Sequence, residues 1–136
     1  MKELTIEAKV ANLQQVLDFV DENLKSMRCP MKILIQIDVA VEEIFVNVAS
    51  YAYAPNTGSV TVQMELQEHP RTVVITFIDS GIPYNPLAKE DPDVTLSAEE
   101  RAIGGLGIYM VKKSMDKMEY EYTDQKNVLK MYKGIE

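Results

Sequence analysis

Two side chains that could ligate a metal ion or accept a proton lie four residues apart in the segment Glu43-Ile-Phe-Val-Asn47. On a helix this spacing places both on one face, one turn from each other. The amide oxygen of Asn47 suits Mg²⁺, and the carboxylate of Glu43 could deprotonate a hydroxyl or a water. Glu42 points about 100° away on the same helix and is not expected to share this role. Taken alone, the pair is equally typical of an ordinary helix surface.

A second segment, Asp79-Ser-Gly-Ile-Pro83, follows an apolar run that ends at Ile78. The carboxylate of Asp79 could accept a hydrogen bond from an exocyclic amine such as that of adenine. Gly81 would allow close approach of a base or an unusual backbone angle. Because Asp, Ser and Gly are standard turn formers, a plain strand-ending turn explains the same residues.

Glycines dominate the third segment, Gly104-Gly105-Leu106-Gly107, which opens an expected helix. Glycines there let the backbone approach a phosphate, and the helix N-terminus offers free N–H groups and partial positive charge. A flexible hinge is the alternative reading. The segment matches neither the G-x-x-x-x-G-K-[ST] loop nor the glycine motif of a dinucleotide-binding fold. In this order, the three segments supply the chemical groups of an ATP site.

Composition limits the classes of function. The 136 residues suit one domain over 1–136, and nearly half of them are apolar. A net charge of −7 argues against direct nucleic-acid binding. The single cysteine, Cys29, cannot form a disulfide within the chain, and the single histidine, His69, lies in an expected turn, so a zinc site is not expected. No apolar run is long enough to cross a membrane, and we expect a cytoplasmic protein.

The elements that would position these segments follow from periodicity. Apolar residues at helical spacing predict three helices, over residues 12–24, 30–51 and 106–115. Alternation and β-branched runs predict five strands, over residues 3–9, 59–67, 72–78, 117–124 and 128–133. Because hairpin strands are grouped, we expect an α+β fold, a two-layer sandwich with a mostly antiparallel mixed sheet and three helices on one face. The irregular stretch 83–103 is long enough to indicate a lid or binding element.

The three segments, with a lid-like loop before the third, resemble the GHKL (Bergerat-fold) ATPase and kinase superfamily, whose ATP-binding domain is that of histidine kinases. The chain looks most like the bacterial anti-sigma-factor serine/threonine protein kinases. The most specific stretches are residues 41–50, 79–87 and 103–112, running on to Met115-Asp116.

The resemblance implies roles for the matching residues. Asn47 would ligate Mg²⁺, and Glu43 would be the general base that prepares a serine hydroxyl on a partner. Asp79 would bind the adenine amine, with Gly81 beside the base. The turn Gly104, Gly105, Leu106, Gly107 would hinge the lid, residues 83–103, and lead the triphosphate to the third helix.

The leading hypothesis is therefore an ATP- and Mg²⁺-dependent protein serine/threonine kinase that also sequesters a regulatory partner. The resemblance implies a sigma factor and/or an antagonist protein as partners, and a homodimer. The alternative is a nucleotide-gated binding module without kinase activity. Retention of Glu43 favours the kinase. Two departures from the family favour the binding module. Asn127 of the last hairpin stands where the family often has threonine, and Ser50-Tyr51, just after Asn47, stand where it often has histidine.

Overall fold

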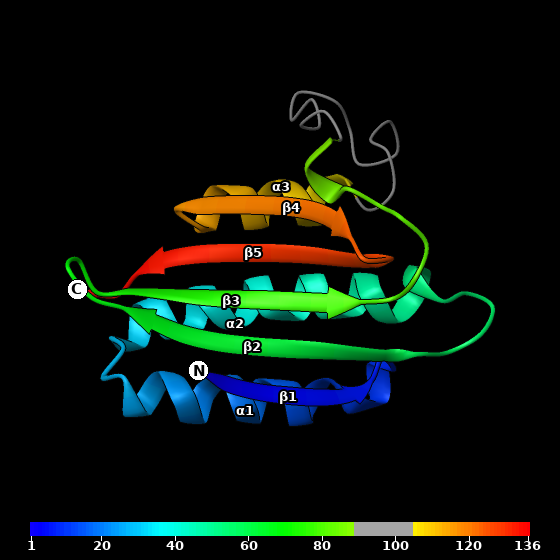
Figure 1. Ribbon diagram of the computed structural model, residues 1–136. Helices are drawn as coiled ribbons and strands as arrows, with labels where there is room; N and C mark the ends of the chain where they lie inside the picture. The colour runs from blue at the N-terminus through cyan, green and yellow to red at the C-terminus, as the bar shows by residue number, and fades with distance from the viewer. Residues whose placement is uncertain (89–104) are drawn as a thin grey trace.

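The computed structural model describes residues 1–88 and 105–136, with side chains from residue 107 onward in the second range. Five strands form one sheet in the order β1-β2-β3-β5-β4. Their bounds are Lys2–Glu7 for β1, Ser59–Gln67 for β2, Thr72–Asp79 for β3, Lys117–Thr123 for β4 and Lys126–Gly134 for β5. All four pairings are antiparallel, so the sheet contains no parallel pair in the part of the chain described (Figure 1).

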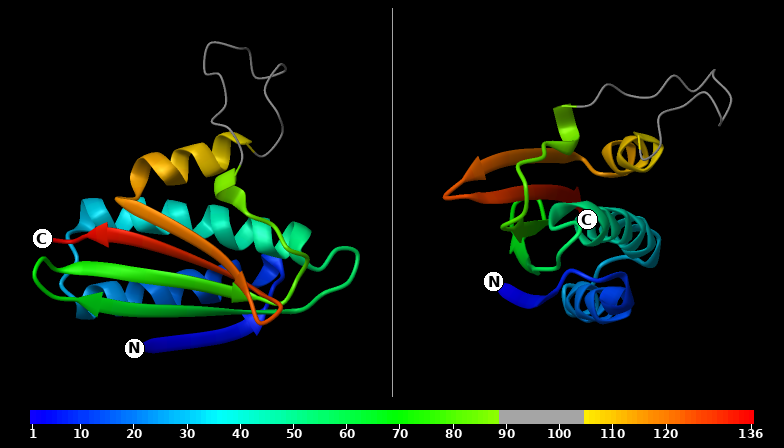
Figure 2. Two further views of the ribbon diagram at one scale, coloured as in Figure 1. Left: turned by 45° about the horizontal axis from the view of Figure 1, so that its top comes forward. Right: turned by 90° about the vertical axis from the view of Figure 1, so that its right-hand side faces the viewer.

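Three α-helices lie on one face of this sheet (Figure 2). They are α1, Leu13–Ser26; α2, Met31–Asn47; and α3, Gly105–Ser114. In the helical layer α2 packs against both α1 and α3. The expected α+β sandwich of five strands and three helices is thereby confirmed.

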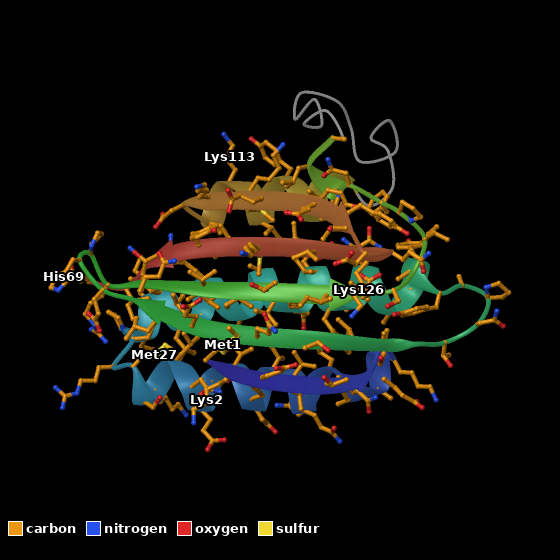
Figure 3. All side chains as sticks on the ribbon, viewed as in Figure 1. Met1, Lys2, Met27, His69, Lys113 and Lys126 are labelled. Atoms are coloured by element: carbon orange, nitrogen blue, oxygen red, sulfur yellow. The ribbon has the colours of Figure 1, made fainter. Side chains whose placement is uncertain are left out.

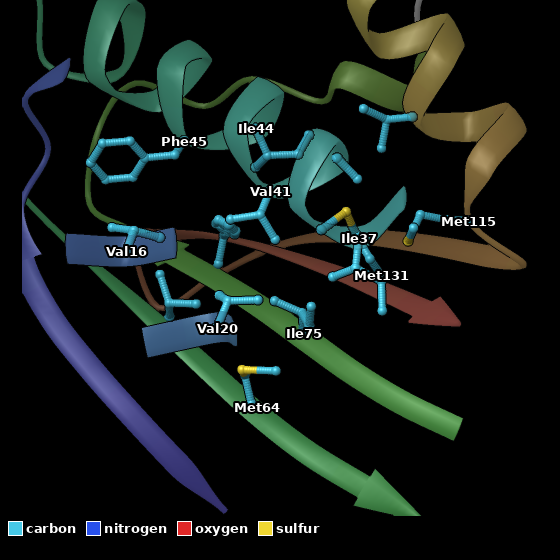
Figure 4. Close-up of a cluster of buried hydrophobic side chains, with 14 of the residues drawn as sticks. Val16, Val20, Ile37, Val41, Ile44, Phe45, Met64, Ile75, Met115 and Met131 are labelled. Carbon is cyan, nitrogen blue, oxygen red and sulfur yellow. The ribbon is translucent and has the colours of Figure 1, made fainter. Parts of the chain in front are cut away.

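The core lies between the sheet and the helices (Figure 4). Val16, Val20 and Leu24 of α1 are fully buried, as their spacing of four residues predicts. They meet the inward-facing residues of the strands, such as Met64 and Ile75. Alternate residues of β3 therefore point into the core, and this alternation fixes which strand-end side chains reach the helix side of the sheet.

Two local features differ from the sequence-based expectations, and one expectation is not tested. Asn12 precedes α1 as expected, but its amide donates to the carbonyl of Glu7 instead of capping the helix. The helix expected to run to Tyr51 is α-helical only to Asn47 and continues as a π-helical turn, Val48–Ala52. Most of the expected lid, together with Gly104, falls on residues 89–104 and lies outside the described residues.

Candidate functional site

A cavity of about 340 Å³ opens where α2 ends, β3 ends and β5 begins. Apolar and aromatic side chains make up most of its lining, and the polar ones are few. It is lined by Ile44, Asn47, Val48, Tyr51, Ala52, Phe77, Asp79, Ile82, Tyr84, Pro86, Ile108, Tyr120, Asn127 and Leu129. This composition is typical of small-molecule sites, in which apolar walls give affinity and a few polar groups give orientation.

Asp79 is the carboxylate of this cavity. It is the last residue of β3 and is only 7% exposed. Its Oδ1 accepts hydrogen bonds from the backbone N–H of Gly81 and from Nδ2 of Asn127, both at 2.9 Å. Within residues 1–88 and 105–136, no hydrogen bond to its Oδ2 is present. The buried charge is therefore compensated at one oxygen, and the other keeps its capacity to accept.

Asn127 is brought to Asp79 by strand register. The two residues are directly paired in the β3–β5 ladder, and both side chains point to the helix side of the sheet. Besides Asp79, its Nδ2 donates to the carbonyl of Ile82, while its Oδ1 accepts from the backbone N–H of Tyr84 and the hydroxyl of Tyr120. This amide ties the end of β3 to the segment that follows it.

Tyr120 closes the network from β4. Its hydroxyl lies 2.5 Å from Oδ1 of Asn127. Burial raises the pKa of the phenol, and the nearby charge of Asp79 adds to this, against the opposing effect of a backbone hydrogen bond from Tyr84. Tyr120 is therefore held in the neutral form, in which it can donate to Asn127.

Gly81 has a steric role that its sequence position did not indicate. A Cβ atom there would lie 2.3 Å from the carbonyl oxygen of Ala52, which is closer than any side chain allows. The same carbonyl accepts the N–H of Ile82 at 3.0 Å. Glycine lets the loop after β3 close onto the π-helical turn. The expected place of Gly81 beside a base stays a prediction.

Asn47 is the last residue of α2 before the π-helical turn, and its side chain is part of the cavity wall. Within the described residues its amide makes no hydrogen bond, so it is a candidate ligand for a substrate or metal. π-helical turns are rare and are often found at functional sites. This one brings Tyr51 and Ala52 into the same wall.

Glu43 lies one turn earlier on α2 and does not line the cavity. Its half-buried carboxylate contacts the first turn of α3, where a Cβ on Gly107 would be only 1.8 Å from Oε1 of Glu43. Glycine at 107 therefore makes room for the carboxylate. Glu42 is exposed. The expectation that Glu43 and Asn47 share a helix face distinct from Glu42 agrees with this arrangement.

The glycine-rich segment begins α3. Helix α3 starts at Gly105, includes Leu106 and Gly107, and brings Ile108 into the cavity wall. Its N-terminus is therefore next to the cavity, as a phosphate-binding helix would require. Gly104 lies outside the described residues.

His69 lies in the β2–β3 hairpin, at the end of the sheet opposite Lys126 and the cavity (Figure 3). Among the residues described, no group of three His, Cys, Asp or Glu side chains could hold a metal ion. No helix in the same residues is long and apolar enough to cross a membrane.

Three contributors to this site were not predictable from the sequence, namely the donors of Asn127, the hydroxyl of Tyr120 and the fit of Gly81 against Ala52. The only signal available was that Asp79 and Asn127 each lie at a strand end. Turning that signal into a contact requires the β3–β5 register, which connects residues 48 positions apart.

Comparisons with known proteins agree with this geometry. The family model of the histidine kinase-like ATPase domain matches residues 6–133. The fold is similar to the crystal structure of the RsbU and RsbW domains of Rv1364c from Mycobacterium tuberculosis, with a TM-score of 0.64 and 14% sequence identity. That alignment covers 99% of this chain and 33% of the other, so this chain spans about a third of that one's length. No curated protein matches the sequence.

Proposed function

The chain belongs to the histidine kinase-like ATPase domain family, and on this premise we propose that it binds Mg·ATP in the cavity and phosphorylates a serine or threonine of a partner protein. The observation that carries the proposal is Asp79, a buried carboxylate with one uncommitted oxygen in the wall of a largely apolar cavity. An adenine ring fits this combination, because its faces are apolar and its exocyclic amine is a donor.

The walls of the cavity would hold the base. Tyr51, Tyr84 and Phe77 offer aromatic surface, and Ile44 and Ile108 offer aliphatic surface. The amine would donate to Asp79. The triphosphate would extend toward the N-terminus of α3, where unpaired N–H groups favour negative charge.

The donor set fits Mg²⁺ bound together with a nucleotide. Mg²⁺ usually takes one or two protein oxygens and completes its shell with phosphate oxygens and waters. Asn47 offers one amide oxygen in the cavity wall. When bound there, the ion would neutralise charge on the phosphates.

Glu43 is proposed as the general base. It lies one turn from Asn47 and against the first turn of α3, close to the helix N-terminus proposed to hold the phosphates. A carboxylate there would accept the proton of a serine hydroxyl and orient that hydroxyl. We further propose that the phosphorylated partner is an antagonist protein, that the chain also sequesters a sigma factor, and that it acts as a homodimer in the cytoplasm, as its resemblance to anti-sigma-factor kinases implies.

The second candidate is a nucleotide-gated binding module without transfer activity. The observation that favours it is the position of Glu43, which contacts Gly107 and does not line the cavity. In that case Glu43 would hold the first turn of α3 and would not touch a hydroxyl.

Calorimetric titration with ATP, with and without Mg²⁺, tests the binding step. We expect Mg²⁺-dependent binding in the wild type and its loss in Asn47→Ala. Undiminished Mg·ATP affinity in Asn47→Ala would remove the metal-ligand assignment, and no binding in the wild type would remove the proposed site.

Phosphoserine formation on proteins that co-purify with the chain, followed by mass spectrometry, tests the transfer step. Glu43→Gln should keep nucleotide binding and lower transfer by about 10²-fold or more. Glu42→Gln, one residue away and exposed, is the matched control and should transfer normally. Binding in the wild type without any transfer would favour the binding module.

A further inference from the structure

We propose that Asn127 is the residue that determines base specificity, by holding the carboxylate of Asp79 in one orientation without touching the base. This inference rests on the proposed function, since it concerns how the same cavity distinguishes one nucleotide base from another. It assigns a positioning role to a residue whose place in the family is often taken by threonine.

Asn127 is itself unavailable to a ligand. A side-chain amide has two donor hydrogens and two acceptor lone pairs. Both hydrogens are used, on Asp79 at 2.9 Å and on the carbonyl of Ile82 at 2.9 Å. Both lone pairs are used as well, by the N–H of Tyr84 at 3.1 Å and the hydroxyl of Tyr120 at 2.5 Å. Although it lines the cavity, Asn127 therefore acts through its neighbours.

The consequence for Asp79 is a fixed carboxylate. Without support, its χ2 torsion would let the two oxygens exchange places or turn away from the cavity. Asn127 and the N–H of Gly81 both hold Oδ1, from two different directions. Oδ2 is then the single acceptor left, and its position is set before a ligand arrives.

Oδ2 accepts no hydrogen bond from the described residues, and such a fixed acceptor selects by the chemistry of the purine 6-position. A 6-amino group donates to Oδ2. A 6-oxo group would place two acceptors in contact, and a 6-hydrogen would leave the buried carboxylate oxygen without a partner, which is costly. The orientation that Asn127 imposes thus makes the carboxylate of Asp79 specific for a purine with a 6-amino group.

The test compares the affinities for ATP and for purine riboside triphosphate, which lacks only the 6-amino group. The wild type should favour ATP by about 10- to 100-fold, as expected for a hydrogen bond to a charged group. In Asn127→Ala this ratio should fall to about threefold or less. The affinity for purine riboside triphosphate should change much less than that for ATP.

Asn127→Asp is a second variant of the same size. It keeps an acceptor for Tyr84 and Tyr120 but, when ionised, cannot donate to Asp79. Two adjacent carboxylates favour the uptake of one proton, and a protonated Asp at this position could donate again. The preference for ATP should therefore be lost at pH 8 and restored on acidification toward pH 5, whereas the wild type should keep it throughout.

The outcomes separate the two ideas. Equal loss of affinity for both nucleotides in Asn127→Ala, with an unchanged ratio, would mean that Asn127 only supports the fold and would overturn this inference. A pH-independent ratio in Asn127→Asp would overturn it too. A wild type that binds neither nucleotide would overturn the proposed function and this inference with it, whereas a wild type that binds both equally would overturn this inference alone.

Discussion

Two carboxylates in this molecule are removed from water in opposite ways. Asp79 at the cavity receives donors from an amide and a backbone N–H on one oxygen. Asp38 of α2 faces Asp21 of α1, and its hydrogen-bond partner is this second carboxyl group. The Oδ1 atoms of Asp21 and Asp38 are both buried and have no hydrogen-bond partner among the residues described.

The difference lies in what each environment does with charge. Two donors bind Oδ1 of Asp79, so its Oδ2 is kept as an acceptor at the cavity. At the helix pair, burial, the hydrogen bond to Asp21 and the charge of Asp21 together raise the pKa of Asp38 to about 7, against a smaller opposing effect of Lys25. Removal from water is therefore offset by donors at Asp79, whereas it favours proton binding at the half-buried Asp38.

The largest expected effect comes from breaking the donor geometry at Asp79. Gly81→Ala forces a Cβ against the carbonyl of Ala52 and displaces the N–H that Asp79 accepts. We expect a loss of about 2–3 kcal/mol in the free energy of unfolding, measured by chemical denaturation, because backbone must move. Gly134→Ala, whose Cβ would meet Asp116 at 3.4 Å, is the control and should change stability by less than about 0.5 kcal/mol. Equal stabilities of the Gly81→Ala and Gly134→Ala variants would contradict the close approach of Gly81 to the carbonyl of Ala52.

The same substitution, Asp to Asn, should impair ligand binding at Asp79 but improve stability at Asp38. Asp79→Asn removes the charged acceptor and should lower ATP affinity by about 10- to 100-fold, while GTP is affected less. Competition binding with the two nucleotides measures this. If ATP and GTP lose affinity equally, Asp79 does not read the base.

Asp38→Asn should stabilise the protein at high pH. The pKa of Asp38 is raised from 3.8 to about 7 on folding, so the stability gained by proton binding is fully present below pH 3.8 and is lost as the pH rises to 7. Asparagine keeps a donor to Asp21 without the charge. After allowance for solvent screening, we expect a gain of about 1 kcal/mol at pH 8 and less than half of that at pH 5. Denaturation curves at both pH values check this, and a gain of equal size at both would rule out the shared proton.

The smallest expected effect is on stability and concerns Tyr120, the residue that supports Asp79 through Asn127. Tyr120→Phe removes one hydrogen bond from the amide that supports Asp79 and should cost about 1 kcal/mol. Tyr132→Phe removes an exposed hydrogen bond to Glu119 and should cost less than Tyr120→Phe. Thermal unfolding of the two variants is the measurement. The order of the two costs is the informative result, and a larger cost at Tyr132 would contradict the network.

Much of the fold was predictable because each element carries its own pattern. The strand expected over 59–67 has those bounds in the structure, and the helical stripe that includes Ile37, Val41 and Ile44 is buried. Propensity and periodicity act over a few residues, so they can be read locally. The end of α2 was not predictable, since nothing in the sequence up to Tyr51 distinguishes a π-helical turn from a continuing α-helix.

The contacts of the site were less predictable than its candidate residues, whose binding of a ligand stays a prediction. Asp79 and Asn47, which line the cavity, could be singled out by type and spacing. The bonds of Asn127 could not, because they depend on pairing between strands that are distant in sequence. The close approach of Gly81 to Ala52 depends on how the loop after β3 packs against the end of α2, which no short-range pattern encodes. The roles in binding and transfer stay predictions.

The lining of the cavity also gives the molecule an optical property. Three of its seven tyrosines, Tyr51, Tyr84 and Tyr120, line the cavity, and the chain has no tryptophan. No indole is present to accept excitation energy from these phenols or to mask their emission. Three of the seven phenols behind the intrinsic fluorescence of the unlabelled protein therefore lie in the cavity wall, and a molecule stacked there should change that fluorescence without any dye being attached.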